Sequence, residues 1–509
     1  MTARSAQAAL ELGRDALLRG QDGEGWWKGV LDTNVTMDAE DLLLRHVLGV
    51  LDPADVAATG AWIRSQQRDD GTWATFHGGP ADLSTTVEGY VALRLAGDAA
   101  DASHLEKARA FILEHGGVER TRVFTRIWLA ICGRWSWDDL PALPPEIMLL
   151  PSSMPLNIYD FACWARQTIV PLTVVWSQRL TRPLPFDIDE LRSGSLPAPP
   201  PTSLRTWPGR LTALDHLLKR YERHRVGAVR RAALARAERW IVQRQEADGS
   251  WGGIQPPWVY SMMALHALGY PIDHPVLQAG FQGLERFTVR EHGTRRLEAC
   301  QSPVWDTALA VIALADAGVD SGGPAISRAT DWLLEKEIRI CGDWSVRRPD
   351  LAPGGWAFEF ANVHYPDIDD TAEVVLALAR VDQEAAGIAE PITRGIDWMV
   401  GMQCADGGWG AFDVDNTRSI CRQLPFCDFG EVIDPPSADV TAHVVEVLAV
   451  LGRSPEQRDR GVEWLWRHQE DDGSWFGAGA PTTSMGPEPS YRRSSRPACP
   501  PTTHGSAGR

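Results

Sequence analysis

The sequence lacks the features that mark several large classes of protein. No stretch is long and apolar enough to span a bilayer. There is no basic excess, since 67 Asp and Glu against 50 Lys and Arg leave a net charge of −17, which argues against nucleic acid as the main partner. The first residues lead into an amphipathic helix and not into an apolar signal core, so we expect no cleaved leader. Peripheral attachment to one membrane leaflet stays open.

Cysteine is present but follows no recognisable pattern. The eight Cys residues are scattered, with no Cys-x-x-Cys pair and no spacing typical of metal ligands. This usage predicts reduced thiols in a cytoplasm. At 509 residues, the chain is long enough for two or more domains or for a repeat array with a large core.

Tryptophan is abundant, and many of the 22 Trp residues follow one recurring pattern. Copies of Trp-x4-Gln-x3-Gly-x-Trp begin at Trp62, Trp240, Trp398 and Trp464. Degenerate copies run from Trp332 to Trp344, with Glu337 in the place of Gln, and from Gln21 to Trp27. A fixed repeat of this kind predicts an α-helical array or toroid.

Each copy predicts a helix that ends in a tight turn. The first Trp would lie on the buried face, the Gly would form a left-handed C-cap, and the Gln amide would bond the end of a neighbouring helix. The segments between copies are rich in Ala, Leu and Val at helical spacing, and nothing indicates an extended sheet. We therefore expect an all-α fold in which the Trp residues pack and do not catalyse.

Three segments interrupt the helical pattern. The Pro-rich stretch at 197–202 predicts an exposed linker or loop. The segments 343–366 and 412–436 are long and irregular, and loops of that length in a compact domain usually carry function.

An acidic motif follows the first long loop. Asp367, Asp369 and Asp370 fall within four positions, Glu373 comes close behind, and an apolar run begins at Val374. Carboxylates this crowded cannot all ionise once they leave water, so at least one should keep its proton near neutral pH and could act as a Brønsted acid.

Two other interpretations of this motif were considered. Alone, the motif favours a solvated helix N-terminus, where carboxylates complement the dipole. Asp369-Asp370-x-x-Glu373 also fits a Mg²⁺ site for diphosphate ionisation, but the second metal motif that this would need is not found. The surrounding Gln-Trp repeats, however, favour a Brønsted acid over a solvated helix N-terminus.

Together, the Gln-Trp repeats, the Asp-x-Asp-Asp-Thr-Ala motif and the long loops resemble the triterpene cyclases, most closely the bacterial squalene–hopene cyclases. The resemblance runs from about residue 10 to Phe476. It implies two α/α barrels (alpha-alpha toroids), one inserted in the other. The implied division is an N-terminal helix of the catalytic barrel at 1–30, an inserted barrel at 31–300, an incomplete catalytic barrel at 301–477 and a tail at 478–509.

The resemblance also implies an activity. Members of the family cyclise squalene to hopene- or hopanol-type pentacyclic triterpenes by protonating a terminal alkene and guiding a carbocation cascade. They use no metal and no organic cofactor. They are homodimers bound peripherally, as monotopic proteins, to one membrane leaflet, which predicts the cytoplasmic face of the membrane here and no nucleic-acid partner.

Catalytic residues carry over one at a time. The family's acid is the middle Asp of the motif, here Asp369, with Asp367 and Asp370 tuning it. A His in an Asp-Val-Thr-x-His segment anchors the acid, here His443 with Asp439. Asp370 stands where the related oxidosqualene cyclases carry Cys, which favours the alkene-protonating type, although the Thr-Ala-Glu tail matches both groups.

Cavity residues carry over by the same local matches. Aromatic faces stabilise cations by about 1–2 kcal/mol each when desolvated. The matching aromatic positions are Trp164, Trp305, Phe358 and Phe412, the last replacing a more usual Tyr. Ile254, Gln255 and Pro256 match a cavity wall, Phe426 and Cys427 match the substrate entrance, and Glu40, Glu88 and Arg122 match charged positions at the far end.

The sequence changes character after Gly477. Residues 478–509 hold no Leu, Ile, Val, Phe or Trp and predict disorder. The family continues with Arg-Trp-Gly-x-Asn-Tyr, a segment that the tail can encode in a shifted frame, so we hypothesise a frameshift. If the tail is genuine, the barrel lacks its closing helices and we expect an inactive protein.

Two alternatives stay open. One is another class II terpene cyclase acting on a diterpene diphosphate or on oxidosqualene, although no convincing basic pocket for a diphosphate is evident. The other is a non-catalytic α-helical repeat protein, which the altered C-terminus would favour.

Overall fold

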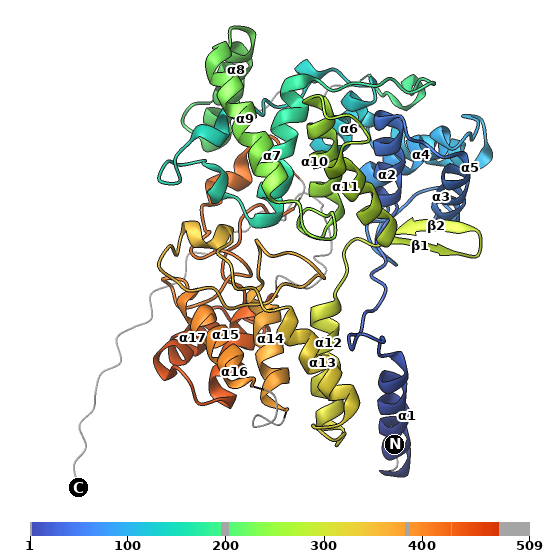
Figure 1. Ribbon diagram of the computed structural model, residues 1–509. Helices are drawn as coiled ribbons and strands as arrows, with labels where there is room; N and C mark the ends of the chain where they lie inside the picture. Colours follow the sequence, from blue (N-terminus) through green and yellow to red (C-terminus); the bar gives the residue numbers. More distant parts are fainter. Residues whose placement is uncertain (1–2, 195–202, 382–386, 429, 478–509) are drawn as a thin grey trace.

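The computed structural model describes residues 3–194, 203–381, 387–428 and 430–477. Helices dominate this part of the chain and form two groups, one above the other in Figure 1, with long loops between them. The predicted linker at 197–202 and the predicted tail at 478–509 lie outside the described residues, so those predictions are untested.

The first group holds the middle of the chain. Its helices are α2 (Thr36–Leu48), α3 (Pro53–Ser65), α4 (Leu83–Leu95), α5 (Ser103–Glu114), α6 (Val123–Ile131), α7 (Cys163–Gln178), α8 (Trp207–Arg223), α9 (Gly227–Gln243), α10 (Gln255–Ala267) and α11 (Pro275–Arg286). An antiparallel hairpin follows, formed by β1 (Thr288–Glu291) and β2 (Thr294–Leu297). Helices α4, α2, α10 and α7 lie in a row, and α5, α3, α11 and α9 pack against them.

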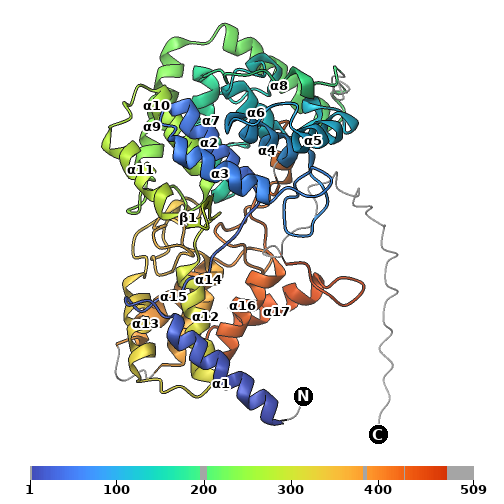
Figure 2. The same cartoon turned by 90° about the vertical axis from the view of Figure 1, so that its right-hand side faces the viewer.

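The second group joins the N-terminal helix to the last third of the described chain. It holds α1 (Ala3–Gly20), α12 (Pro303–Asp316), α13 (Pro324–Glu335), α14 (Ile368–Ala379), α15 (Ala389–Gly401), α16 (Ala438–Val450) and α17 (Pro455–Arg467). Helices α12, α14 and α16 lie side by side, each backed by the next helix along the chain. Helix α1 packs against α12, far from its neighbours in sequence, as both views show (Figures 1 and 2).

Short 3₁₀ helices lie within the loops between the α-helices. They are η1 (Val118–Arg120), η2 (Trp137–Asp139), η3 (Pro145–Leu149), η4 (Ile158–Asp160), η5 (Asp189–Leu191), η6 (Asp343–Val346) and η7 (Ser419–Gln423). The long loops at 343–366 and 412–436 contain η6 and η7 and connect α13 to α14 and α15 to α16, as predicted.

Each group has its own hydrophobic core. One core runs from Val35 to Leu297 and takes in four residues of the second long loop, Cys421, Phe426, Val432 and Ile433. The other combines Trp27 with residues from Val304 to Leu448. The all-α prediction is confirmed apart from the single hairpin, and the closure of each group into a barrel stays a prediction. No helix in the described ranges has the length and apolar character needed to cross a bilayer.

In three of the four exact repeats, the Gln side chain donates to two carbonyls. Gln403 donates to the carbonyls of Gly407 (2.8 Å) and of Gln457 (2.9 Å), which lies in the first turn of α17. Gln67 reaches His104 at the start of α5 in the same way, and Gln245 reaches Val276 at the start of α11. The predicted bond to a neighbouring helix end is therefore present, and it pins the start of the following helix.

The Gly and the closing Trp complete the turn. Gly71, Gly249 and Gly407 have φ of +82°, +86° and +103°, the left-handed region that was predicted. They lie in the turn beyond the helix and not at its C-cap, which is Gln66 in the case of α3. The closing Trp indole donates back to the residue after the first Trp, as Trp409 does to the carbonyl of Met399 (2.7 Å).

The degenerate copy after Trp332 closes differently from the prediction. Its indole contact comes from Trp356, which donates to the Leu333 carbonyl at 2.7 Å, and not from Trp344. The loop inserted after Glu337 displaces the closing Trp along the chain. Glu337 itself pairs with Arg394 on α15 at 2.6 Å, so an ion pair replaces the Gln contact.

Buried ion pairs join the two groups. Arg166 of α7, fully buried, donates to Asp343 (2.9 Å) and to Asp413 (2.6 Å), one from each long loop. Tyr365 donates its hydroxyl to Asp343 at 2.7 Å. Burial alone would raise the pKa of Asp343, but the charges of Arg166 and Arg244 outweigh it and lower this pKa to about 2. Both long loops are thereby held against α7.

Candidate active site

The acidic motif begins helix α14. Asp367 is the N-cap, and its Oδ1 accepts the Asp369 amide at 2.8 Å. The Thr371 hydroxyl accepts the amide of Trp356 at 2.9 Å. The same Trp-to-Thr bond recurs between Trp409 and Thr441, so the motif's Thr belongs to the repeat architecture. The carboxylates of the motif therefore lie at a helix start whose Thr contact is shared with another repeat.

This helix end is buried and not solvated. Asp367 is 9% exposed and Asp370 is 1% exposed, whereas the Asp369 side chain remains 24% exposed. Burial, followed by the charges of neighbouring carboxylates, raises the pKa of both Asp367 and Asp370 well above the usual range. Asp370 Oδ1 has no hydrogen-bond partner among the described residues. The surroundings of the two flanking carboxyls therefore favour their protonated forms.

His443 reaches the motif from α16. Its Nδ1 lies 2.5 Å from Asp369 Oδ1 and 3.8 Å from Glu373 Oε1. The hydrogen bond to Asp369 raises the pKa of His443 to about 9 against the opposing effect of burial. A protonated imidazole therefore donates to one oxygen of Asp369 and leaves Oδ2 available. Asp439, in the first turn of α16, adds a smaller charge effect in the same direction.

Two further buried carboxyls belong to this cluster and escaped the sequence analysis. Glu359 is 8% exposed, and burial raises its pKa to about 8. Asp434 is 4% exposed, and burial together with the charge of Asp413 raises its pKa to about 7. Both act electrostatically on Asp367. No sequence signal distinguishes them from surface acids, because their burial depends on loops folding over the start of α14.

The predicted aromatic side chains lie in two places, one beside His443 and the other at the contact of Phe412 with Trp164. The Trp305 ring, on α12, is centred 6.0 Å from that of His443. Phe358 lies beside the start of α12, where its carbonyl accepts the Val304 amide at 3.4 Å. Phe412 packs edge-on against Trp164, with ring centres 6.0 Å apart and planes at 67°. All four predicted aromatic residues are partly exposed, and Trp164 lines a cavity.

A cavity of about 260 Å³ lies beside the Phe412–Trp164 pair, and Trp164 lines it. Its walls include Trp164, Ile254 and Pro256 from the predicted set and the charged group Glu40, Glu88 and Arg122. Burial, then the charge of Glu88, raises the pKa of Glu40 well above its ordinary value. Burial also raises the pKa of Glu88 to about 7, although the Arg122 charge opposes it. The cavity therefore has an aromatic and aliphatic wall with a carboxyl pair.

Six of the nine predicted substrate-binding residues do not line this cavity: Trp305, Phe358 and Phe412, which are described above, and Gln255, Phe426 and Cys427. Gln255 is buried, with its amide directed to the Met37 carbonyl at 3.5 Å. Phe426 packs on Phe161, with ring centres 6.3 Å apart. Cys427 donates its amide to the Leu424 carbonyl at 2.9 Å. The 424–427 segment follows η7, which contacts α8 at the surface.

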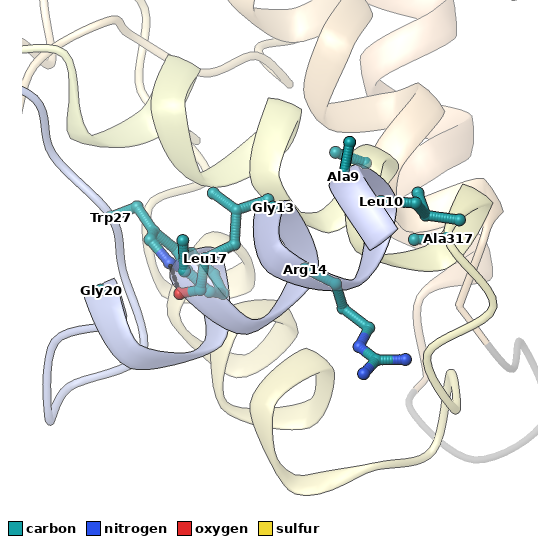
Figure 3. A pocket seen from close by; sticks show the side chains of 10 residues that line it. Ala9, Leu10, Gly13, Arg14, Leu17, Gly20, Trp27 and Ala317 are labelled. Atoms are coloured by element: carbon teal, nitrogen blue, oxygen red, sulfur yellow. Dashed lines mark hydrogen bonds between the residues drawn. The ribbon is translucent and has the colours of Figure 1, made fainter. Parts of the chain in front are cut away.

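A larger cavity, of about 620 Å³, lies elsewhere (Figure 3). It forms between α1 and α12, and Leu10, Leu17, Trp27 and Ala317 are among the residues that line it. None of the predicted site residues reaches it, so it is not a candidate active site.

Two family models match the chain, and together they cover most of it. The model described as the squalene-hopene cyclase N-terminal domain matches residues 10–293. The model described as the squalene-hopene cyclase C-terminal domain matches residues 301–480.

Curated relatives are similar over almost the whole chain. The squalene–hopene cyclase of Alicyclobacillus acidocaldarius is 47% identical over 483 residues, covering 93% of this chain and 75% of that protein. The squalene–hopene cyclase of Zymomonas mobilis is 37% identical, covering 91% of this chain and 73% of that protein. The squalene-hopene cyclase of Schizosaccharomyces japonicus is 36% identical, covering 93% and 74%.

Among solved structures, ent-copalyl diphosphate synthase from Arabidopsis thaliana aligns with a TM-score of 0.43 at 12% identity, covering 92% of this chain and 53% of that chain. This likeness is too distant to inform function. Nothing in these matches supports the hypothesised frameshift, which falls on residues 478–509, outside the described residues.

Proposed function

Because the chain belongs to the squalene–hopene cyclase family, we propose that it cyclises squalene to hopanoid pentacyclic triterpenes, and that Asp369 is the acid. The observation that carries this proposal is the contact of the His443 imidazole with one oxygen of Asp369, at 2.5 Å, beside two carboxyls whose pKa is raised by burial.

The chemistry of the first step follows from these groups. The Asp369 O–H bond breaks, and the π electrons of the terminal alkene form a C–H bond with the proton and leave a tertiary cation. The π electrons of the next alkene attack this cation, which closes the first ring and moves the positive charge along the chain. Asp369 becomes a carboxylate, and the cationic His443 stabilises that charge at hydrogen-bond distance. Burial raises the pKa of Asp367 and Asp370, and in their protonated forms these two carboxyls would not oppose ionisation of Asp369.

The cation then needs apolar, electron-rich surroundings. Trp305 lies beside the acid, and the Phe412–Trp164 pair lies beside the cavity, so aromatic faces are available at both places. Each face is worth up to about 2 kcal/mol to a desolvated cation. Glu88, with a pKa raised to about 7 by burial, can accept a proton at the far end of the cavity.

We also propose peripheral attachment to a membrane, through α8 and the residues around it. Leu204, Trp207, Leu217 and Val226 are more than half exposed there. Basic side chains, including Arg210 and Lys219, share the helix. This combination suits an interface with anionic lipid, and η7, next to the predicted entrance at Phe426 and Cys427, contacts the same helix. The cytoplasmic face and a homodimer remain proposals drawn from the family resemblance.

The division into domains is likewise a proposal. The two hydrophobic cores support a domain that combines residues 1–30 with residues 301–477, and a second domain formed by residues 31–300. The four loop residues that join the first core, Cys421 among them, show that the second long loop is shared between the groups.

Asp369→Asn tests the function. Incubation with squalene, with products identified by mass spectrometry, should show cyclisation by the unaltered protein and by Asp397→Asn, an exposed control on α15, and no turnover by Asp369→Asn. Turnover by Asp369→Asn would overturn the assignment of the acid. Absence of turnover in the unaltered protein would favour the non-catalytic alternative, and turnover only of oxidosqualene or a diterpene diphosphate would favour another class II cyclase.

A further inference from the structure

One buried carboxylate organises the loop that carries Phe412. Asp434 Oδ1 accepts the amide of Ala411 at 3.0 Å, and its Oδ2 accepts the amides of Phe412 and Asp413 at 2.7 Å each. Three consecutive backbone N–H groups thus converge on one side chain. Such a concave run of amides binds acceptor oxygens, and here both oxygens belong to a side chain of the protein itself.

The same loop is held from two other directions. The Ala411 carbonyl accepts the amide of Ile368 at 2.9 Å, which ties the loop to the start of the acid helix α14. The Asp413 side chain is bound by Arg166 at 2.6 Å. At Gly410, a Cβ would lie 2.8 Å from the Asp434 carbonyl and 3.1 Å from its Oδ1, so a side chain there would push the loop away from Asp434.

The second ring of the aromatic pair is held by the same short segment. Trp164 Nε1 donates to the Glu431 carbonyl at 2.8 Å. The Ala162 amide, at the N-cap of α7, donates to the Val432 carbonyl at 2.9 Å. Residues 431–434 therefore hold Trp164 through their backbone and Phe412 through the Asp434 side chain.

This arrangement sets the geometry of the cavity wall. Trp164 lines the 260 Å³ cavity, and Phe412 lies 6.0 Å from it, ring centre to ring centre. Cation–π attraction requires the charge to lie within about 6 Å of a ring centroid, so a displaced ring loses most of its effect. Among the contacts of the described residues, the Trp164 indole donates only to the Glu431 carbonyl, and Phe412 is held at its own backbone amide by Asp434.

We propose that Asp434 is a positioning residue for the cyclisation: it holds the Phe412–Trp164 pair in place and so keeps the carbocation cascade from ending before the last rings close. This inference rests on the proposed function. Asp434 acts through Phe412, because both of its oxygens are occupied by backbone amides and neither is free for substrate.

The test compares Asp434→Asn with a matched control, Glu119→Gln. Glu119 is also 4% exposed and also accepts two consecutive amides, of Ser193 at 3.1 Å and Gly194 at 3.2 Å, but it lies in η1, outside the cavity. Asparagine turns an NH₂ group toward amides that need acceptors, so the loop should loosen. We expect kcat for complete cyclisation to fall about 10- to 100-fold, with KM changed less than about twofold, and partly cyclised products to accumulate in Asp434→Asn alone.

Two companion variants keep the proposal falsifiable. Phe412→Ala should give the same partly cyclised products, and adding Asp434→Asn to it should change nothing further. If Asp434→Asn does not fold, Gly410→Ala, which displaces the same loop without changing a charge, should reproduce its product pattern. Wild-type products at wild-type kcat from Asp434→Asn, or from Gly410→Ala in its place, would overturn the positioning role.

Hydrogen exchange separates this inference from the proposed function, because it needs no turnover. Asp434→Asn should raise the exchange rate of the 411–413 amides at least about 10-fold, and Glu119→Gln should raise exchange only near 193–194. Unchanged protection at 411–413 would overturn the inference even in an active enzyme. Loss of protection in a protein that converts no squalene would leave the positioning of Phe412 standing and reject the function.

Discussion

His443 and Asp369 lie 74 positions apart in the chain, and their side chains meet at 2.5 Å between the starts of two adjacent helices, α16 and α14. The contact sets the charge of the imidazole, because it raises the pKa of His443 to about 9. It also orients the carboxyl, since one oxygen is occupied and the other faces away from the imidazole. A residue of helix α16 therefore orients the proposed acid, Asp369, on the adjacent helix α14.

Removing the imidazole should slow the reaction without unfolding the protein. We expect His443→Ala to lower kcat on squalene about 100-fold, because the carboxylate left after proton transfer loses its cationic partner. KM should change little. His292→Ala, in the exposed turn of the hairpin, is the control. Equal kcat values for the two variants would contradict the role assigned to His443.

The stability of the protein should fall as the pH rises through about 9. In the folded state the pKa of His443 is raised from 6.5 to about 9, so between those values the folded state binds more protons than the unfolded state. Stability from this group is complete below about pH 6.5 and is lost above about pH 9. Melting temperatures of wild type and His443→Ala should converge across that interval. A constant difference between them would contradict the shift.

The Gln of a buried repeat should matter more than the Gln of an exposed one. Gln403 is 6% exposed and makes two bonds to carbonyls, whereas Gln469 is partly exposed and makes one, to Gly473. We expect Gln403→Ala to cost about 1–3 kcal/mol of unfolding free energy, since two buried carbonyls lose their donor. Gln469→Ala should cost under about 0.5 kcal/mol. Urea denaturation distinguishes them, and equal losses would refute the distinction.

Arg166 should contribute strongly to the free energy of unfolding, because its ion pairs form the joint between the two helix groups. Arg166→Met leaves Asp343 and Asp413 buried without their shared cation, and breaking a buried pair in this way costs about 3–5 kcal/mol. Arg179→Met breaks only an exposed pair with Asp138 and should cost under about 1 kcal/mol. Denaturant unfolding gives both values. A loss below about 1 kcal/mol for Arg166→Met would show that the ion pairs do not stabilise the joint.

The repeat pattern allowed the helical architecture to be predicted well, because its causes are local. A Gly at fixed spacing supplies the left-handed turn, and a Gln four residues earlier reaches the carbonyl of that Gly, as Gln67 does with Gly71 at 2.8 Å. The prediction was wrong where an insertion broke the spacing: Trp356, and not Trp344, closes the copy that starts at Trp332. The length of a loop between two contacts is not visible in a short motif.

The candidate site could be predicted only in part. The acid motif and the His443 segment have local signatures, and their predicted hydrogen bond is present in the structure. Glu359 and Asp434 have none, because a lone Glu or Asp in a loop looks the same in sequence whether it ends in water or under another loop.

By itself, the sequence determined that this protein is a helical repeat protein of the squalene–hopene cyclase family, because helix periodicity, turn glycines and an acidic motif are encoded over a few residues each. Tertiary structure alone decided which carboxyls have a raised pKa and which aromatic rings are held in place. Loops and helices that are distant in the chain come together at this site and exclude water. They bury Asp367 and Asp370, bring His443 into contact with Asp369, and let Asp434 bind the amide of Phe412. Desolvation acts over several ångströms in space, and a sequence does not show which of its residues will share that space.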